Sequence, residues 1–103
     1  MEEKGYNLEV CAYCLRSLDN NSRTTDHIFP KSRGGIRSNH NKVPACGDCN
    51  KLKGNMNIKE FSRALNSLIF YEVENHKKTL GYLKKVKINV ERITRKYYGA
   101  TDE

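Results

Sequence analysis

The sequence predicts a small α+β domain, in which a turn-rich core of two short strands and one short helix precedes basic helices. With 103 residues, the chain has room for one compact domain of ordinary size. All four cysteines, both prolines and four of the seven glycines lie between residues 11 and 54. Beyond residue 57, apolar residues recur at the three- and four-residue spacing of amphipathic helices. We therefore expect residues 1–57 to form the core module and residues 58–103 to form a helical extension of the same domain.

The core module carries signals for two strands and a helix. The apolar pair before Pro30 favours a strand from Thr25 to Pro30, and this proline limits how far the strand can continue. Residues 31–41 contain two adjacent glycines and two asparagines, which predicts a loop. Val43 to Ala45 is then expected to return as a second strand, and Cys46 to Lys53 to open a short helix.

Helices are predicted for the second half of the chain. Asn57, followed three residues later by Glu60, resembles a capping box, and we expect a helix from 58 to about 73. The helical spacing then continues in a second set of apolar residues, namely Leu80, Leu83, Val86, Val90, Ile93 and Tyr97. Residues 84–91 alone also fit an alternating strand, although the longer pattern favours a helix.

The cysteines form two C-x-x-C pairs, Cys11 with Cys14 and Cys46 with Cys49. Two such pairs can supply the four thiolates of a tetrahedral Zn²⁺ site. Two disulfides are the alternative, but adjacent C-x-x-C cysteines are poorly placed for separate bridges. The spacing predicts one structural zinc, because four protein ligands leave no open position for water or substrate. Any catalytic chemistry must then lie elsewhere.

The charge points to a polyanionic partner. The net charge is +7 with a pI near 9.3, and residues 75–98 hold eight basic side chains against the single acidic Glu91. Nucleic acid is the first candidate. The N-terminal residues are acidic, and the longest apolar run, residues 68–71, is too short for a signal peptide or a membrane span. We expect a cytoplasmic protein without membrane contact.

Three strings carry a family resemblance: C-A-Y-C at 11–14, T-D-H-I-F-P-K-S-R-G-G at 25–35, and N-K-V-P-A-C-G-D-C-N-K-L-K-G-N at 41–55. Over residues 11–55 the chain resembles the HNH endonucleases of the ββα-metal fold, in the subset with a four-cysteine zinc. The resemblance implies that Asp26 and His27 lie on the first strand, Asn41 on the second and Asn50 on the helix. The chain departs from the family name by having asparagine at position 50, a substitution that is common in the family and should change the metal preference.

The residues agree with the endonuclease chemistry that the resemblance implies. Phosphodiester hydrolysis needs a general base, and a histidine such as His27 is largely neutral at cytoplasmic pH. Asp26 and Asn50 offer hard oxygens suited to a catalytic Mg²⁺ or Mn²⁺. Asn41 is expected to bind loop backbone and to fix the orientation of His27. Taken singly, His27 reads as a core residue, and Asn41 and Asn50 read as ordinary turn and helix-start residues.

Basic residues near these positions are candidates for DNA binding. Arg33 and Arg37 flank the glycine loop, and Lys51 and Lys53 follow Asn50 on the same helix. In each case a merely solvated side chain is an equal alternative. The last predicted helix places further basic residues opposite its apolar side, including Lys84, Lys85, Arg92 and Arg95. We expect these four to contact the DNA backbone without sequence preference.

The sequence thus predicts a metal-dependent endonuclease that acts on double-stranded DNA and nicks one strand as a monomer. The apolar faces of the two C-terminal helices are also compatible with a homodimer. One rival is a non-catalytic zinc-knuckle module that binds nucleic acid, but such a module has no need for Asp26, His27 and Asn50. Another rival is a protein-interaction domain stabilised by a metal ion, but such a domain does not need so basic a surface.

Overall fold

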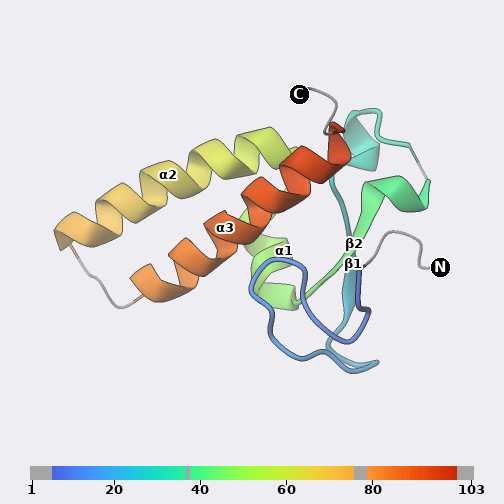
Figure 1. Ribbon diagram of the computed structural model, residues 1–103, viewed down its shortest axis with the longest axis horizontal. Helices are drawn as coiled ribbons and strands as arrows, with labels where there is room; N and C mark the ends of the chain where they lie inside the picture. The colour runs from blue at the N-terminus through green and yellow to red at the C-terminus, as the bar shows by residue number, and fades with distance from the viewer. Residues whose placement is uncertain (1–5, 37, 76–78, 100–103) are drawn as a thin grey trace.

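The computed structural model describes residues 6–36, 38–75 and 79–99 and has an α+β fold. Strands β1 (Thr24–His27) and β2 (Lys42–Ala45) form a two-stranded antiparallel sheet, and the helices are α1 (Gly47–Lys53), α2 (Ile58–Asn75) and α3 (Leu80–Tyr97). Helices α2 and α3 lie side by side as a long hairpin, with the sheet beyond one end of the pair (Figure 1). None of the helices in the described ranges is both long and apolar enough to cross a membrane.

The first strand ends three residues earlier than predicted. The register pairs Asp26 with Val43 and His27 with Lys42, and β1 stops there. Beyond His27 the backbone binds Asn41 instead of a partner strand. The N–H of Ile28 donates to the Asn41 backbone oxygen at 2.9 Å, and the N–H of Phe29 donates to Asn41 Oδ1 at 2.8 Å.

The β1–β2 connection depends on two glycines, as the sequence indicated. Gly34 ends a 3₁₀ turn, Lys31–Arg33, with φ +98°, a conformation that disfavours other residues. Gly35 lies so close to the preceding backbone that a Cβ atom there would be 1.9 Å from the Phe29 oxygen. The connection therefore folds back tightly on the end of β1.

The predicted helices are confirmed, including the helical state of residues 84–91. Asn57 and Glu60 form the expected capping box, since each backbone N–H donates to the other's side chain at 2.9 Å. The buried side of α3 consists of Leu83, Val86, Asn89, Val90 and Ile93. It packs in one core with Phe61 and Leu65 of α2 and with Tyr13, whose ring meets Phe61 edge to face at 5.5 Å.

Candidate functional site

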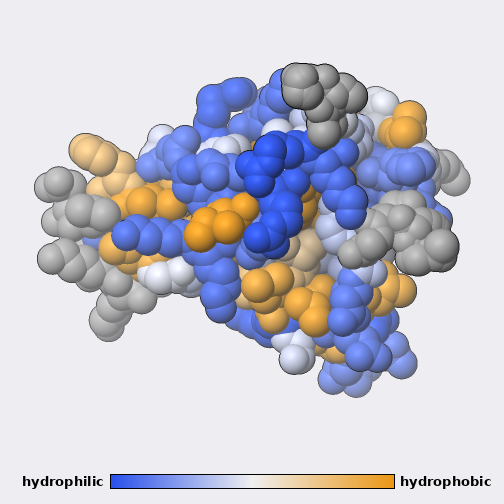
Figure 2. Space-filling view, in the orientation of Figure 1, coloured by the Kyte–Doolittle hydropathy of each residue, from blue (hydrophilic) through white to orange (hydrophobic). Residues whose placement is uncertain are grey.

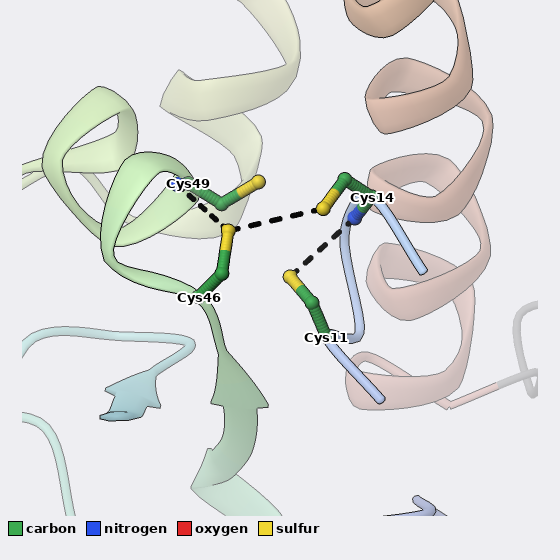
Figure 3. A group of neighbouring side chains, drawn as sticks. All are labelled: Cys11, Cys14, Cys46 and Cys49. Atoms are coloured by element: carbon green, nitrogen blue, oxygen red, sulfur yellow. Dashed lines mark hydrogen bonds between the residues drawn. The ribbon is translucent and has the colours of Figure 1, made fainter. Parts of the chain in front are cut away.

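The four cysteines converge on one point between the N-terminal turn and α1. All four are buried free thiols, and their sulfur atoms lie within 4.8 Å of one another (Figure 3). The Cys14 and Cys46 sulfurs are 3.8 Å apart, far beyond a disulfide bond length. A tetrahedron with Zn–S bonds of about 2.3 Å has edges of about 3.8 Å. The donor set and its spacing therefore fit a single Zn²⁺ ion.

Hydrogen bonds within the cluster favour a thiolate at Cys11. Cys11 Sγ accepts from the backbone N–H groups of Tyr13 at 3.4 Å and Cys14 at 3.5 Å, and Cys46 Sγ accepts from Cys49 at 3.4 Å. Hydrogen bonding, above all from the Cys49 thiol, lowers the pKa of Cys11 to about 4. The same hydrogen bond raises the pKa of Cys49, so the negative charge is concentrated on Cys11, and this charge is suited to a cation.

Helix α3 also reaches the cysteine cluster, which the sequence did not indicate. The Tyr82 hydroxyl lies 3.0 Å from Cys49 Sγ, and the Asn89 amide donates to the Tyr13 backbone oxygen at 2.8 Å. Both residues interrupt the apolar pattern of α3 with polar atoms. No local pattern predicts these contacts, because the partners are 33 and 76 positions apart in the sequence.

A second group of side chains gathers where β1 meets α1. Asn50, on α1, donates its side-chain N–H to Thr24 Oγ1 at 2.9 Å. Thr24 and Asp26 are two positions apart on β1 and so share one face of the strand. One turn after Asn50, Lys53 donates to the His27 backbone oxygen at 2.8 Å and pairs with Asp26 at 3.2 Å. These contacts hold α1 against β1, with Asn50 at Thr24 and Lys53 at Asp26.

Asp26 is buried, with 5% of its surface exposed. Its Oδ2 accepts from the Tyr13 hydroxyl at 2.5 Å and from the Lys53 ammonium at 3.2 Å. Burial raises the pKa of Asp26 above its ordinary value, while Lys53 and Tyr13 act in the opposite direction. The carboxylate of Asp26 and the amide oxygen of Asn50, whose N–H end binds Thr24, are hard donors of the kind that suit Mg²⁺ or Mn²⁺.

His27 is half-buried at the end of β1. Burial, followed by the nearby ammonium of Lys31, lowers the pKa of His27 below its ordinary value of about 6.5. A lowered pKa keeps the imidazole neutral at pH 7, as a general base requires.

Asn41 does not lie on the second strand, as the resemblance implied, but ends the 3₁₀ turn Asn39–Asn41 directly before β2. Its buried amide binds loop backbone, as expected, by accepting from Phe29 and donating to the oxygens of Phe29 and Ile36. These bonds fix the chain immediately after His27. The control of His27 orientation by Asn41 remains a prediction.

The predicted DNA-binding residues have different environments. The prediction that Lys53 contacts DNA is wrong, because its side chain is fully buried and paired with Asp26 and so has no surface free for DNA. Arg33 makes a bidentate ion pair with Glu60 of α2, with N–O distances of 2.5 and 3.2 Å. Arg37 lies outside the described residues, and Lys51 is exposed on α1.

The four predicted DNA contacts of α3, Lys84, Lys85, Arg92 and Arg95, are all exposed. The α3 side of the molecule is mostly hydrophilic, with apolar side chains visible between the charged ones (Figure 2). The Arg92 guanidinium also donates to Asn89 Oδ1 at 3.0 Å. A basic surface of this kind suits a polyanion.

The fold and the site define a small α+β protein with a strand–strand–helix core and a four-cysteine cluster that fits a metal ion. A sequence model described as HNH endonuclease matches residues 11–66, more than half of the chain, and the chain belongs to this family. The match begins at the first cysteine and ends within α2. No curated protein matches the sequence. Membership of this family supports a nuclease function.

Proposed function

We propose that this protein is a metal-dependent endonuclease that hydrolyses phosphodiester bonds of double-stranded DNA. The observation that supports the proposal is the junction of β1 and α1 within the family match, where Asn50 bonds Thr24 and Lys53 bonds Asp26 and the His27 backbone. His27 acts as the general base that takes a proton from the attacking water. Asp26 and Asn50 hold Mg²⁺ or Mn²⁺, which when bound supplies positive charge to the scissile phosphate and the leaving oxygen.

The direct test is cleavage of supercoiled plasmid by protein loaded with zinc at the cysteines. We expect cleavage when Mg²⁺ or Mn²⁺ is added and none when it is omitted; omission is preferable to a chelator, which would also strip the zinc. With one active site per chain, a monomer should produce nicked circles first at low enzyme concentration. Linear product without a nicked intermediate at every concentration would instead indicate a dimer that cuts both strands.

Binding without cleavage under all of these conditions would contradict the proposal. It would assign the protein to the alternative class, a non-catalytic zinc-knuckle module that binds nucleic acid. The cysteine cluster alone is compatible with that class, so only the residues at the β1–α1 junction separate the two functions.

The identity of residue 50 should set the preference for the catalytic metal ion. The wild type is expected to work with Mg²⁺ or Mn²⁺ and poorly with added Zn²⁺, because its ligands there are oxygens. Asn50→His offers an imidazole nitrogen and should shift relative activity toward Co²⁺, Ni²⁺ and Zn²⁺, whereas Asn50→Ala should depress cleavage with every ion. Plasmid cleavage across these ions measures the order.

A matched control for Asn50→His is Asn66→His, because Asn66 is an exposed asparagine on α2. This variant adds the same imidazole away from the junction and should leave the ion order unchanged. If Asn50→His also leaves the order unchanged, or if the wild type prefers Zn²⁺ or Ni²⁺, Asn50 is not a ligand of the catalytic ion.

The basic side of α3 should contribute electrostatic, sequence-independent affinity for DNA. Each phosphate contact adds about −0.9 to the slope of log affinity against log salt concentration. Replacing Lys84, Lys85, Arg92 and Arg95 together with glutamine should flatten that slope by as much as about 3.6, if each side chain contacts one phosphate. Fluorescence anisotropy with a labelled duplex across a salt series measures the slope.

Lys59 and Arg63 provide the comparison for the α3 variant, since both are exposed basic residues on α2. Changing them to glutamine should alter the slope much less than changing the α3 residues. An unchanged slope in the quadruple α3 variant would remove α3 from the DNA-binding surface.

A further inference from the structure

A buried polar cluster includes Asp26 of the candidate active site and links it to the first cysteine pair. Its members are Tyr13, Asp26 and Lys53, each 5% exposed or less. Tyr13 lies between Cys11 and Cys14 in the sequence, Asp26 lies on β1 and Lys53 lies on α1. The cluster therefore joins three separate parts of the core module at one carboxylate.

The two oxygens of Asp26 are held unequally. Oδ2 accepts the Tyr13 hydroxyl at 2.5 Å and the Lys53 ammonium at 3.2 Å, whereas Oδ1 has a longer contact of 3.4 Å with the same ammonium. A buried carboxylate stays ionised only when such partners compensate for lost water. Tyr13 and Lys53 thus anchor one oxygen and leave the other less restrained.

The Tyr13 hydroxyl is itself held in a fixed position. The phenol ring is fully buried and packs edge to face against Phe61, at 5.5 Å and 83°. The Tyr13 backbone is fixed on both sides, because its N–H donates to Cys11 Sγ and its oxygen accepts from Asn89 at 2.8 Å. A donor fixed in this way can define the orientation of the carboxylate that it binds.

We propose that Tyr13 is a positioning residue that orients the Asp26 carboxylate for the catalytic cation. The inference rests on the proposed function, because it assumes that Asp26 binds that cation. The Tyr13 hydroxyl fixes Oδ2 and so presents the carboxylate in one orientation. The turn that contains Cys11 and Cys14 therefore also sets the position of the Tyr13 side chain.

The test is Mn²⁺ binding to zinc-loaded protein without DNA, followed by electron paramagnetic resonance of free Mn²⁺. Tyr13→Phe removes the hydroxyl and keeps the ring that packs on Phe61. We expect its dissociation constant for Mn²⁺ to rise about tenfold to a hundredfold, the range typical of lost hydrogen bonds to metal ligands. Asp26→Asn should abolish Mn²⁺ binding at this site. Tyr97→Phe removes a hydroxyl elsewhere, at the edge of the core, and should bind Mn²⁺ as the wild type does.

Cleavage kinetics provide a second readout. In Tyr13→Phe the Mn²⁺ concentration for half-maximal cleavage should rise by the same factor, while the rate at saturating Mn²⁺ stays within about threefold of wild type, because His27 is unchanged. Zinc content and the circular dichroism spectrum should match the wild type, because the cysteines and the aromatic packing remain.

The outcomes separate the positioning role from the proposed function. If Asp26→Asn weakens Mn²⁺ binding and Tyr13→Phe binds within twofold of wild type, the positioning role of Tyr13 is wrong and the metal assignment stands. If Asp26→Asn binds Mn²⁺ as the wild type does, the metal assignment fails and the role of Tyr13 fails with it. Loss of zinc or helix signal in Tyr13→Phe would also overturn the proposal, since the hydroxyl would then be maintaining the fold.

Discussion

Replacing any one of the four cysteines with serine is expected to unfold the whole domain. The cysteines are all buried and belong to the same core as Phe61, Leu65 and the apolar side of α3. A structural Zn²⁺ contributes roughly 10 kcal/mol or more of apparent folding free energy, whereas an entire domain has only about 5–15 kcal/mol of stability. Elemental analysis should find about one zinc per wild-type chain, and circular dichroism should show loss of helix in the variants.

Leu15→Ser is the matched control for the cysteine variants. Leu15 follows Cys14 directly and is 51% exposed, so its replacement alters the same turn without removing a sulfur ligand. This variant should keep its zinc and its helix content. If the wild-type protein is folded but contains no zinc after purification under reducing conditions, the cysteines do not bind a structural zinc and the fold does not require one.

The parts of the fold that the sequence predicted are those with local signatures. The C-x-x-C spacing predicts the cysteine cluster, because each pair presents two sulfurs to one point, the first pair from a turn and the second from the start of α1. The exchange of hydrogen bonds between Asn57 and Glu60 occurs within one helical turn. Such patterns depend on a few neighbouring residues and are visible before the tertiary structure is known.

The partners of Asp26 had no comparable signature. Tyr13 and Lys53 are 13 and 27 positions from Asp26, and their contacts exist only when the cysteine turn, β1 and α1 are packed together. The sequence predicts that a lysine in a polar helical segment is solvated. Lys53 is buried instead, because a carboxylate and a backbone oxygen accept hydrogen bonds from its ammonium group. Similarly, Glu60 was predicted only as a cap, but it also pairs with Arg33 from the β1–β2 connection.

His27→Ala is expected to reduce DNA cleavage by a hundredfold to ten-thousandfold, the usual contribution of a positioned general base. Zinc content and DNA affinity should remain those of the wild type, because the side chain is half-buried at the end of β1 and belongs to neither the cysteine cluster nor the basic side of α3. Plasmid cleavage at saturating Mg²⁺ measures the loss. His40→Ala is the matched control, since His40 is exposed in the turn before β2 and should leave the rate unchanged.

The pH dependence gives an independent check on His27. Its pKa in the folded protein is lowered below about 6.5, and the neutral imidazole is the active form, so the rate should stay level down to about pH 6.5 and fall only below it. The unfolded chain takes up this proton first as the pH falls, so the same group makes the fold less stable below about pH 6.5 and has no effect above it. Circular dichroism at each pH separates loss of base from loss of fold. A His27→Ala protein that cuts within threefold of wild type, with the same acidic limb, would require a different base.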